Sequence, residues 1–262
     1  MRIALLIFPL LVFSLLFSCS DKKSAKSDQE TFVSAKDNAD SVEADTMGSN
    51  RNHLHTSFQN CKSLNYKFLV PAHYHYINPG RMIDSSWVEI YQKGKKFYRA
   101  KAQYTIKRRW SDYIGDTANV LYGKRKAFLF VNHLPAKLGE MEAANLNFDE
   151  YITLRPNKVC SFMFGGKRYN LEIKKEKKES DSVPFTCFAL LNGKQIAKRT
   201  KVFEVAFELL FAGDIDGDGK LDLVIDFASD TGEFKVVLFL SYCALPGQPV
   251  QQVGEIDDQY DC

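Results

Sequence analysis

Four aspartates in one short segment of the chain have the residue type and spacing of a metal-binding loop. The segment reads Gly213-Asp-Ile-Asp-Gly-Asp-Gly-Lys-Leu-Asp222, with carboxylates at loop positions 1, 3, 5 and 9. Ca²⁺ takes about six to eight oxygen ligands, and alternate carboxylates in a tight loop converge on one point. Gly219 falls at position 6, where such a loop turns sharply. The sequence therefore predicts a Ca²⁺ site whose ligands are Asp214, Asp216, Asp218, the backbone carbonyl of Lys220, and Asp222.

An empty, vestigial loop and a different metal are the alternatives to a Ca²⁺ site. An EF-hand is disfavoured because position 12 is Ile225 rather than Glu, and no helical pattern flanks the loop. The loop resembles the DxDxDGxxD calcium loops of integrin α-chain propellers and of FG-GAP or VCBS repeats. That resemblance implies a strand-loop-strand site in which Asp222 is the bidentate ligand. Only one copy is present, so a whole propeller is not expected.

The N-terminal sequence predicts that the protein is located in the cell envelope. Residues 1–18 have one positive charge and a long apolar run, as in a signal peptide. Leu16-Phe17-Ser18-Cys19 resembles the bacterial lipobox, which implies that Cys19 is lipidated and becomes the mature N-terminus. Ser20 after it favours the outer membrane. A plain signal peptide with a chance cysteine is the alternative. The block from Phe211 to Cys262 also resembles a group of bacterial lipoproteins that carry one such loop.

The composition limits the class of protein. The chain has 262 residues, of which 45% are hydrophobic, and a net charge of +3, which excludes a wholly disordered or polytopic membrane protein. The small charge and the envelope address argue against a nucleic-acid partner. Residues 19–57 are rich in Lys, Asp, Ser and Asn, which predicts a flexible tether. Residues 58–262 are expected to be the folded part, with a sub-boundary near residues 147–157.

Short runs of β-branched and aromatic residues between turn signals predict a mainly β fold. We expect an antiparallel sandwich or distorted barrel with at most one short helix, for which Leu134–Leu146 is the candidate. Further strands are expected at Val202–Phe211, Leu221–Phe227 and Phe234–Leu240. Hairpins are predicted at the turns Lys93-Gly94-Lys95, Gly123-Lys124-Arg125, Gly165-Gly166 and Asn192-Gly193.

Residues 97–106 are predicted to form one continuous strand with one solvent-exposed face. Tyr98 and Ala100 would then share the inner face, and Arg99 and Lys101 the solvent face.

Histidines and cysteines offer weaker candidates. His73 and His75 would share one face of a strand and could share a metal, but no third ligand is identifiable, and ordinary surface histidines are the alternative. The pair His53 and His55 lies at the edge of the tether. Five cysteines follow Cys19, so at least one stays unpaired or pairs elsewhere. The pairings considered are Cys243–Cys262 and Cys160–Cys187, with Cys61 left over, and the connectivity stays open.

Charge is unevenly distributed along the chain. Residues 93–109 contain eight Lys or Arg and no acid, whereas residues 206–262 are strongly acidic. A basic face would bind an anionic glycan or an acidic envelope protein. Solvated strand faces are the alternative.

No catalytic residue is nominated, because the chain lacks GxSxG, P-loop, HExxH and Rossmann patterns. The sequence favours a lipid-anchored, calcium-stabilised envelope protein that acts as a binding module or as an accessory subunit of an envelope complex. The alternative is a hydrolase of envelope glycans, since paired carboxylates can come from distant positions. A purely structural spacer is the third class. Clustered acids in a cleft would favour the hydrolase.

Overall fold

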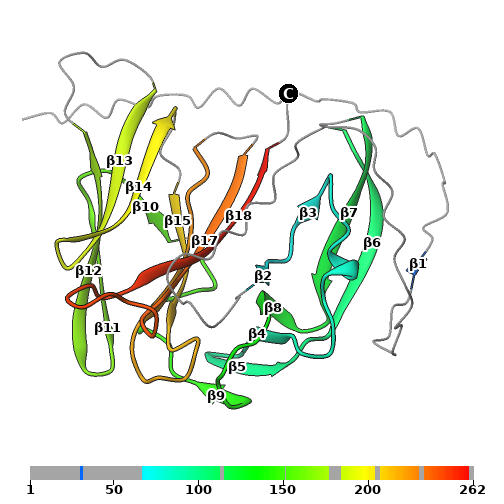
Figure 1. Cartoon of the computed structure of the whole chain (residues 1–262), viewed down its shortest axis with the longest axis horizontal. Coiled ribbons are helices and arrows are strands. Elements are labelled where there is room, and N and C mark those ends of the chain that lie inside the picture. The colour runs from blue at the N-terminus through cyan, green and yellow to red at the C-terminus, as the bar shows by residue number, and fades with distance from the viewer. Residues whose placement is uncertain are drawn as a thin grey trace, which may run out of the picture.

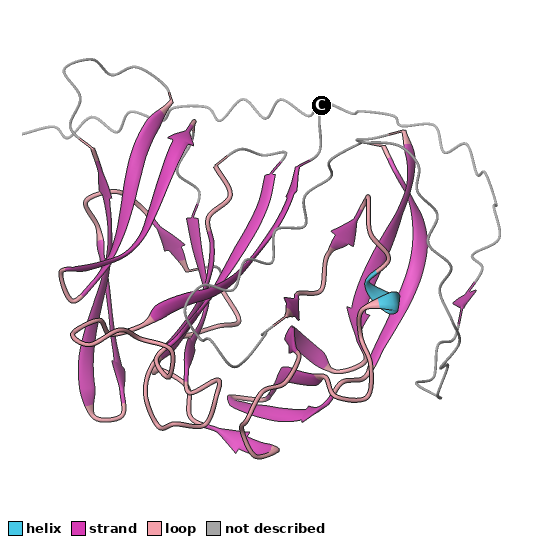
Figure 2. Ribbon diagram, in the orientation of Figure 1, coloured by secondary structure: helices cyan, strands magenta, loops and turns pink. Residues whose placement is uncertain are grey.

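The computed structural model describes residues 30–31, 67–112, 115–150, 152–176, 184–203, 207–229 and 233–259. The signal peptide, Cys19, nearly all of the tether, His53, His55, Cys61 and Cys262 lie outside these residues. The described part is built from strands, with a single 3₁₀ turn, η1 (Pro79–Arg81) (Figures 1 and 2). This confirms the mainly β prediction. No helix of the described part has the length and apolar character needed to cross a bilayer.

Four open antiparallel sheets make up the described residues. We call them the flanking, N-terminal, central and outer sheets. The flanking sheet contains, in spatial order, β1 (Glu30–Thr31), β6 (Tyr104–Ser111), β7 (Asp116–Gly123) and β3 (His73–Tyr74). The N-terminal sheet contains β2 (Phe68–Leu69), β8 (Lys126–Val131), β4 (Val88–Lys93), β5 (Lys96–Lys101) and β9 (Gly139–Met141).

The two remaining sheets use the second half of the chain. The central sheet contains β10 (Thr153–Leu154), β15 (Phe207–Gly213), β16 (Asp222–Asp226), β17 (Glu233–Leu240) and β18 (Gln251–Gln259). The outer sheet contains β11 (Val159–Phe164), β12 (Lys167–Lys175), β13 (Phe185–Leu191) and β14 (Lys194–Val202). In Figure 1 the central sheet lies between the outer sheet and the strands of the first half.

The central sheet is buried on both faces. Val224, Leu238 and Leu240 pack into a core shared with the N-terminal sheet. Their strand neighbours Leu223 and Phe239 pack into a second core shared with the outer sheet. Successive side chains of a strand point to opposite faces, so continuous apolar runs suit a sheet covered on both sides. Because the central sheet belongs to both cores, any loop that it carries is fixed by the packing of the whole molecule.

Three predicted hairpins are confirmed: β4–β5, β11–β12 and β13–β14. In the last of these, Asn192 and Gly193 have φ of 51° and 78°, as a type I′ turn requires. The predicted hairpin around Gly123-Lys124-Arg125 is wrong. β7 pairs with β6 and β3, whereas β8 pairs with β4 and β2. Arg125 forms an ion pair with the buried Glu89 of β4, which directs the chain into the other sheet.

The candidate helix at Leu134–Leu146 is absent. This segment contains β9, which pairs with β5, and Gly139 has a φ of 129°, which no helix accommodates. Strand β18 was not predicted, because its acidic residues gave no apolar pattern. A register shift opposite Leu238 and Phe239 places Val253 and Ile256 in the same core although they are three residues apart.

The continuous strand expected over residues 97–106 breaks into β5 and β6, which belong to different sheets. The prediction of its faces is wrong for the first half: Phe97 and Arg99 are buried, whereas Tyr98 and Ala100 are only partly covered. It is right for Tyr104 and Ile106, which are buried, and for Lys101 and Gln103, which are exposed. The ring of Phe97 lies 5.1 Å from that of Phe211 on the central sheet, so this face of β5 points inward. Arg99 therefore points toward the loop that follows β15.

Candidate metal centre

The hairpin of β15 and β16 positions the aspartate loop. Gly213 pairs with Asp222 at the end of the ladder, so residues 214–221 form the connection between two strands. The strand-loop-strand arrangement is confirmed. Gly213 lies where only a glycine fits, because a Cβ there would come within 2.6 Å of the carbonyl oxygen of Glu142. Gly219 has a φ of 76°, which provides the sharp turn expected at position 6.

Three of the predicted ligands come together. Asp214, Asp216 and Asp218 each offer a carboxylate oxygen, and these oxygens all lie within 4.8 Å of one another. Asp214 is 9% exposed and Asp216 is 4% exposed. Like charges at this separation and burial disfavour each other's ionised form. The cluster can hold a metal ion, which would remove that repulsion.

Backbone donors fix the direction of the three carboxylates. The amide of Gly217 donates to Asp214 Oδ1 (2.7 Å), and the amide of Asp218 donates to Asp216 Oδ1 (3.1 Å). The amide of Lys220 donates to Asp218 Oδ1 (2.8 Å). The contacts of Asp216 and Asp218 are Asx turns, and that of Asp214 reaches one residue further, so all three are encoded locally. The loop is therefore preorganised by its own backbone.

One oxygen of Asp216 lacks a donor among the described residues. Its Oδ2 atom is buried and accepts no hydrogen bond from this part of the chain, whereas buried carboxylate oxygens are normally satisfied. Burial, followed by the charges of Asp218 and Asp214, raises the pKa of Asp216 to about 6. A cation at this oxygen would provide the missing partner.

Asp222 is placed differently from the other three. Its side chain is fully buried, and Asp222 is not one of the three aspartates whose oxygens converge. Its Oδ2 accepts from the amides of Ile215 (2.7 Å) and Asp216 (3.2 Å), and its Oδ1 accepts from Ser241 (2.7 Å). Burial, together with the charge of Asp216, raises the pKa of Asp222 well above its ordinary value. Asp222 therefore ties the loop to the end of β17, and its bidentate role stays a prediction.

Lys220 contacts the cluster through its side chain. Its ammonium lies 3.1 Å from Asp218 Oδ2 and is largely exposed, so this pair contributes little to stability. The carbonyl of Lys220 as a metal ligand stays a prediction.

Sequence reasoning missed two residues beside the loop. Ser241 Oγ donates to the carboxylate of Asp218 at 3.1 and 3.2 Å. Arg99 is 8% exposed, and one guanidinium nitrogen lies 3.5 Å from the carbonyl oxygen of Ile215. Ser241 and Arg99 are far from the loop in sequence, and the alternation of β5 suggested the wrong face for Arg99. No local signal would have identified either residue.

The histidine pair does not form a second metal centre among the described residues. His73 lies on β3, and His75 approaches Ser111 Oγ at 3.3 Å. Burial, with smaller contributions from His75 and Arg109, lowers the pKa of His73. In the part of the chain that the structure describes, the aspartates of the loop are the one group of three or more metal-ligating side chains.

The cysteine pairing Cys160–Cys187 is wrong, since both thiols are free. Cys160 lies on β11 and Cys187 on β13, with β12 between them. Strands two places apart in a sheet are separated by about 9–10 Å, which exceeds the reach of a disulfide. Cys243 is disulfide-bonded, and both Cys61 and Cys262 lie outside the described residues.

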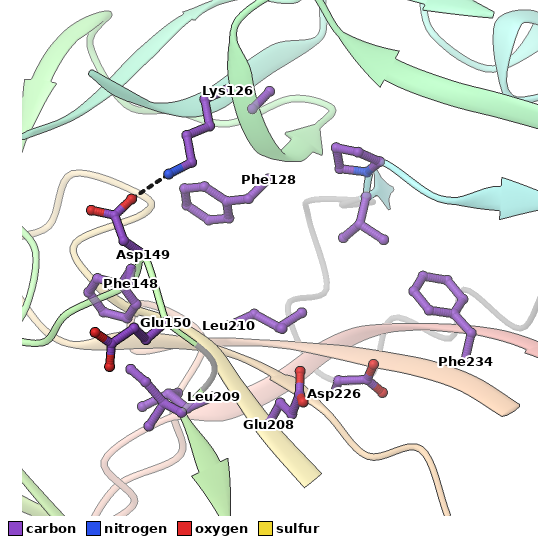
Figure 3. A pocket seen from close by; sticks show the side chains of 14 residues that line it. Lys126, Phe128, Phe148, Asp149, Glu150, Glu208, Leu209, Leu210, Asp226 and Phe234 are labelled. Atoms are coloured by element: carbon purple, nitrogen blue, oxygen red, sulfur yellow. Dashed lines mark hydrogen bonds and ion pairs between the residues drawn. The ribbon is translucent and has the colours of Figure 1, made fainter. Parts of the chain in front are cut away.

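A cleft lies at the opposite end of the same hairpin. Glu208 of β15 pairs with Asp226 of β16, and both side chains line a cavity of about 500 Å³ (Figure 3). Burial, followed by the charge of Asp226, raises the pKa of Glu208. At roughly 3.4 Å per strand residue, Asp226 lies about 14 Å along the strand from Asp222. The hairpin thus carries two separate groups of acids.

Comparisons with known proteins add no further assignment. The chain matches no protein-family model, and neither a curated protein nor a solved structure is significantly similar to it. The likeness of the loop to integrin-type calcium loops therefore rests on the DxDxDGxxD motif and on the strand-loop-strand geometry.

Proposed function

We propose that this chain is a lipid-anchored, calcium-stabilised protein of the cell envelope that acts as a binding module or as an accessory subunit. The observation that supports it most directly is the convergence of Asp214, Asp216 and Asp218 within 4.8 Å, on a loop of the sheet that joins both cores. An ion at this loop would stabilise the element on which the rest of the molecule packs. The lipid anchor in this proposal rests on the lipobox at Cys19, and the outer membrane rests on Ser20 after it.

Calcium is the ion that the donor set favours. The three side chains offer only carboxylate oxygens, and the buried Asp216 Oδ2 has no hydrogen-bond partner in the described part of the chain. Zn²⁺ prefers His and Cys ligands, and Mg²⁺ usually keeps several waters in a strict octahedron. An irregular cage of carboxylate and backbone oxygens suits the larger Ca²⁺. The ion would have a structural role in this proposal.

Thermal unfolding of the full chain in detergent tests the calcium part. An ion that binds only the folded state stabilises it by about 2.7 kcal/mol at a hundredfold excess over Kd. For a folded part of this size, Tm should rise by about 5–10 °C in Ca²⁺ relative to chelator, and by less in Mg²⁺. Asp216→Asn should lose the rise, whereas Glu176→Gln, an exposed acid of the outer sheet, should keep it. Equal Tm values in Ca²⁺ and in chelator would contradict the proposal.

Fractionation of cells tests the anchor. Cys19→Ala removes the acyl attachment site, and stable anchoring depends on several buried chains. The variant should move from the membrane to the soluble fraction, while Ser20→Ala should stay with the membrane. Retention of Cys19→Ala at the membrane would refute the lipobox prediction.

The basic residues of 93–109 do not gather on one sheet. Lys96 pairs with Glu140, Arg99 is buried, and Arg108 and Arg109 lie on β6 of the flanking sheet. An anionic glycan or an acidic envelope protein stays a proposed partner, and the exposed basic side chains are divided between the β4–β5 hairpin and β6.

Hydrolysis of envelope glycans is a second candidate function, favoured by one observation. Glu208 and Asp226 are opposed on neighbouring strands in a cleft, and burial and the charge of Asp226 raise the pKa of Glu208. A carboxyl group with a raised pKa beside a second carboxyl group is the arrangement of many glycosidases. Assays for reducing ends released from envelope polysaccharides, with Glu208→Gln as the inactive control, test this function.

A further inference from the structure

The cleft at the distal end of the β15–β16 hairpin lies between two sheets. Its floor is the central sheet, from which Glu208, Leu210 and Asp226 project, and its roof includes Phe128 of β8 (Figure 3). A volume of about 500 Å³ is typical of a site for a small organic molecule and far larger than a metal ion needs.

The charge of the cleft is negative. Four carboxylates and one ammonium line it among the described residues, and the ammonium of Lys126 is paired with Asp149 at the rim. The carboxylate of Glu208 has no hydrogen-bond or ion-pair partner in the described part of the chain, although it is half-buried. Glu150 lies exposed at the same rim. An uncompensated carboxylate in a partly desolvated site attracts a cation.

The rest of the lining is apolar. Phe128, Phe148 and Phe234 present rings, and the remaining residues are aliphatic. No amide or hydroxyl side chain lines the described cleft, whereas hydrogen-bonding side chains are what a sugar's hydroxyls require. Phenyl rings attract ammonium groups as well as hydrocarbon. The lining therefore suits an apolar molecule that carries a positive charge better than it suits a glycan.

We propose that this cleft binds a small organic ammonium ion with an apolar body, whose nitrogen is held by Glu208 and whose body packs on the phenyl rings. The inference rests on the proposed function, because it names the ligand class of the binding module. Glu150 and Asp226 add negative potential around the nitrogen. The burial that raises the pKa of Glu208 is also what strengthens its attraction for a cation once it is ionised.

Three matched probes test the charge and the body separately. The full chain in detergent with Ca²⁺ is titrated with 2-phenylethylammonium, with the neutral 2-phenylethanol and with the anionic 3-phenylpropanoate, by calorimetry or ligand-observed NMR. We expect the ammonium to bind at least about tenfold more tightly than the alcohol, since charge-assisted hydrogen bonds are the stronger ones. The anionic 3-phenylpropanoate should not bind. Methylammonium, which lacks the apolar body, should bind more weakly than 2-phenylethylammonium.

Matched variants locate the site. Glu208→Gln keeps the size of the side chain and removes its charge, and should weaken ammonium binding by about tenfold or more. Glu150→Gln, at the exposed rim, should have a smaller effect. Glu176→Gln, on the outer sheet, should have none. All three should keep the rise in Tm with Ca²⁺, which shows that they are folded and that the metal centre is intact.

Equal binding of the three phenyl probes, or unchanged binding in Glu208→Gln, would overturn the inference. Release of reducing sugar that Glu208→Gln abolishes, without ammonium binding, would also overturn it and assign the carboxylate pair to hydrolysis. Neither result depends on the calcium proposal, because the effect of Ca²⁺ on Tm is measured on the same samples. A chain that binds the ammonium but ignores Ca²⁺ would contradict the calcium proposal and support the ligand class.

Discussion

The two ends of the β15–β16 hairpin carry acids in opposite circumstances. At the loop end, Asp214, Asp216 and Asp218 converge and accept hydrogen bonds from backbone amides two or three residues ahead. At the cleft end, Glu208 and Asp226 face a wide apolar cavity, and the carboxylate of Glu208 has no partner in the described residues. One end can hold a metal ion, and the other opens on a cavity of about 500 Å³.

The difference shows how local and long-range structure each build an acidic site. The loop needs only a run of alternating aspartates and glycines, because the donors that orient its carboxylates belong to the same few residues. The cleft needs β8, the residues after β9 and the central sheet together, since its walls come from all three. The same residue types thus have different surroundings at the two ends of one hairpin.

The largest expected effect is the difference in stability lost when Asp222 and Glu208 are each replaced by alanine. Asp222→Ala leaves the amides of Ile215, Asp216 and Ser241 buried without an acceptor. It should lower the free energy of unfolding by about 4 kcal/mol. Glu208→Ala should cost less than about 1 kcal/mol. Urea unfolding in chelator measures both without a contribution from bound Ca²⁺, and equal losses would remove the distinction drawn between the two ends.

An intermediate effect should reverse its sign with calcium. Without a metal, Asp216→Asn removes a buried charge that Asp214 and Asp218 repel, so it should stabilise the chain by about 1 kcal/mol. With saturating Ca²⁺ the same variant lacks a ligand and should be about 2 kcal/mol less stable than the natural chain. Paired urea titrations of the natural chain and the variant, with and without Ca²⁺, test whether the sign of the stability difference changes. A variant that is destabilised by the same amount in both conditions would show that the loop holds no ion.

The smallest expected effect is the pH dependence at the cleft end. The pKa of Glu208 is raised in the folded chain above its ordinary value of 4.5, so the folded state binds more protons than the unfolded state just above that pH. The contribution of this group to stability is therefore present below pH 4.5 and is lost as pH rises through the raised pKa. Glu208→Gln should remove this dependence. The natural chain should fall in stability relative to the variant as the pH rises above 4.5, as measured by urea unfolding.

Much of the fold followed from local patterns. The Asn192-Gly193 and Gly165-Gly166 turns predicted their hairpins correctly because each turn determines its own register. The hairpin predicted around Lys124 is wrong. Arg125 forms an ion pair with Glu89 of β4, a contact that no local pattern reveals. β18 was missed because its acids interrupt the apolar pattern; the strand accommodates two of them through Lys235 of β17, whose ammonium lies 2.9 Å from Glu255 and 2.5 Å from Asp257. Such contacts exist only after the sheets have formed.

The sequence by itself determined the aspartate loop, since its ligands, its turn glycines and its orienting amides are contiguous. Tertiary structure decided which distant partners complete it: the hydroxyl and the amide of Ser241 at the end of β17, and Arg99 from β5. It also decided that the central sheet would be covered on both faces and that Glu208 would face a cleft. These outcomes depend on contacts between residues far apart in the chain, whose positions follow from packing rather than from spacing.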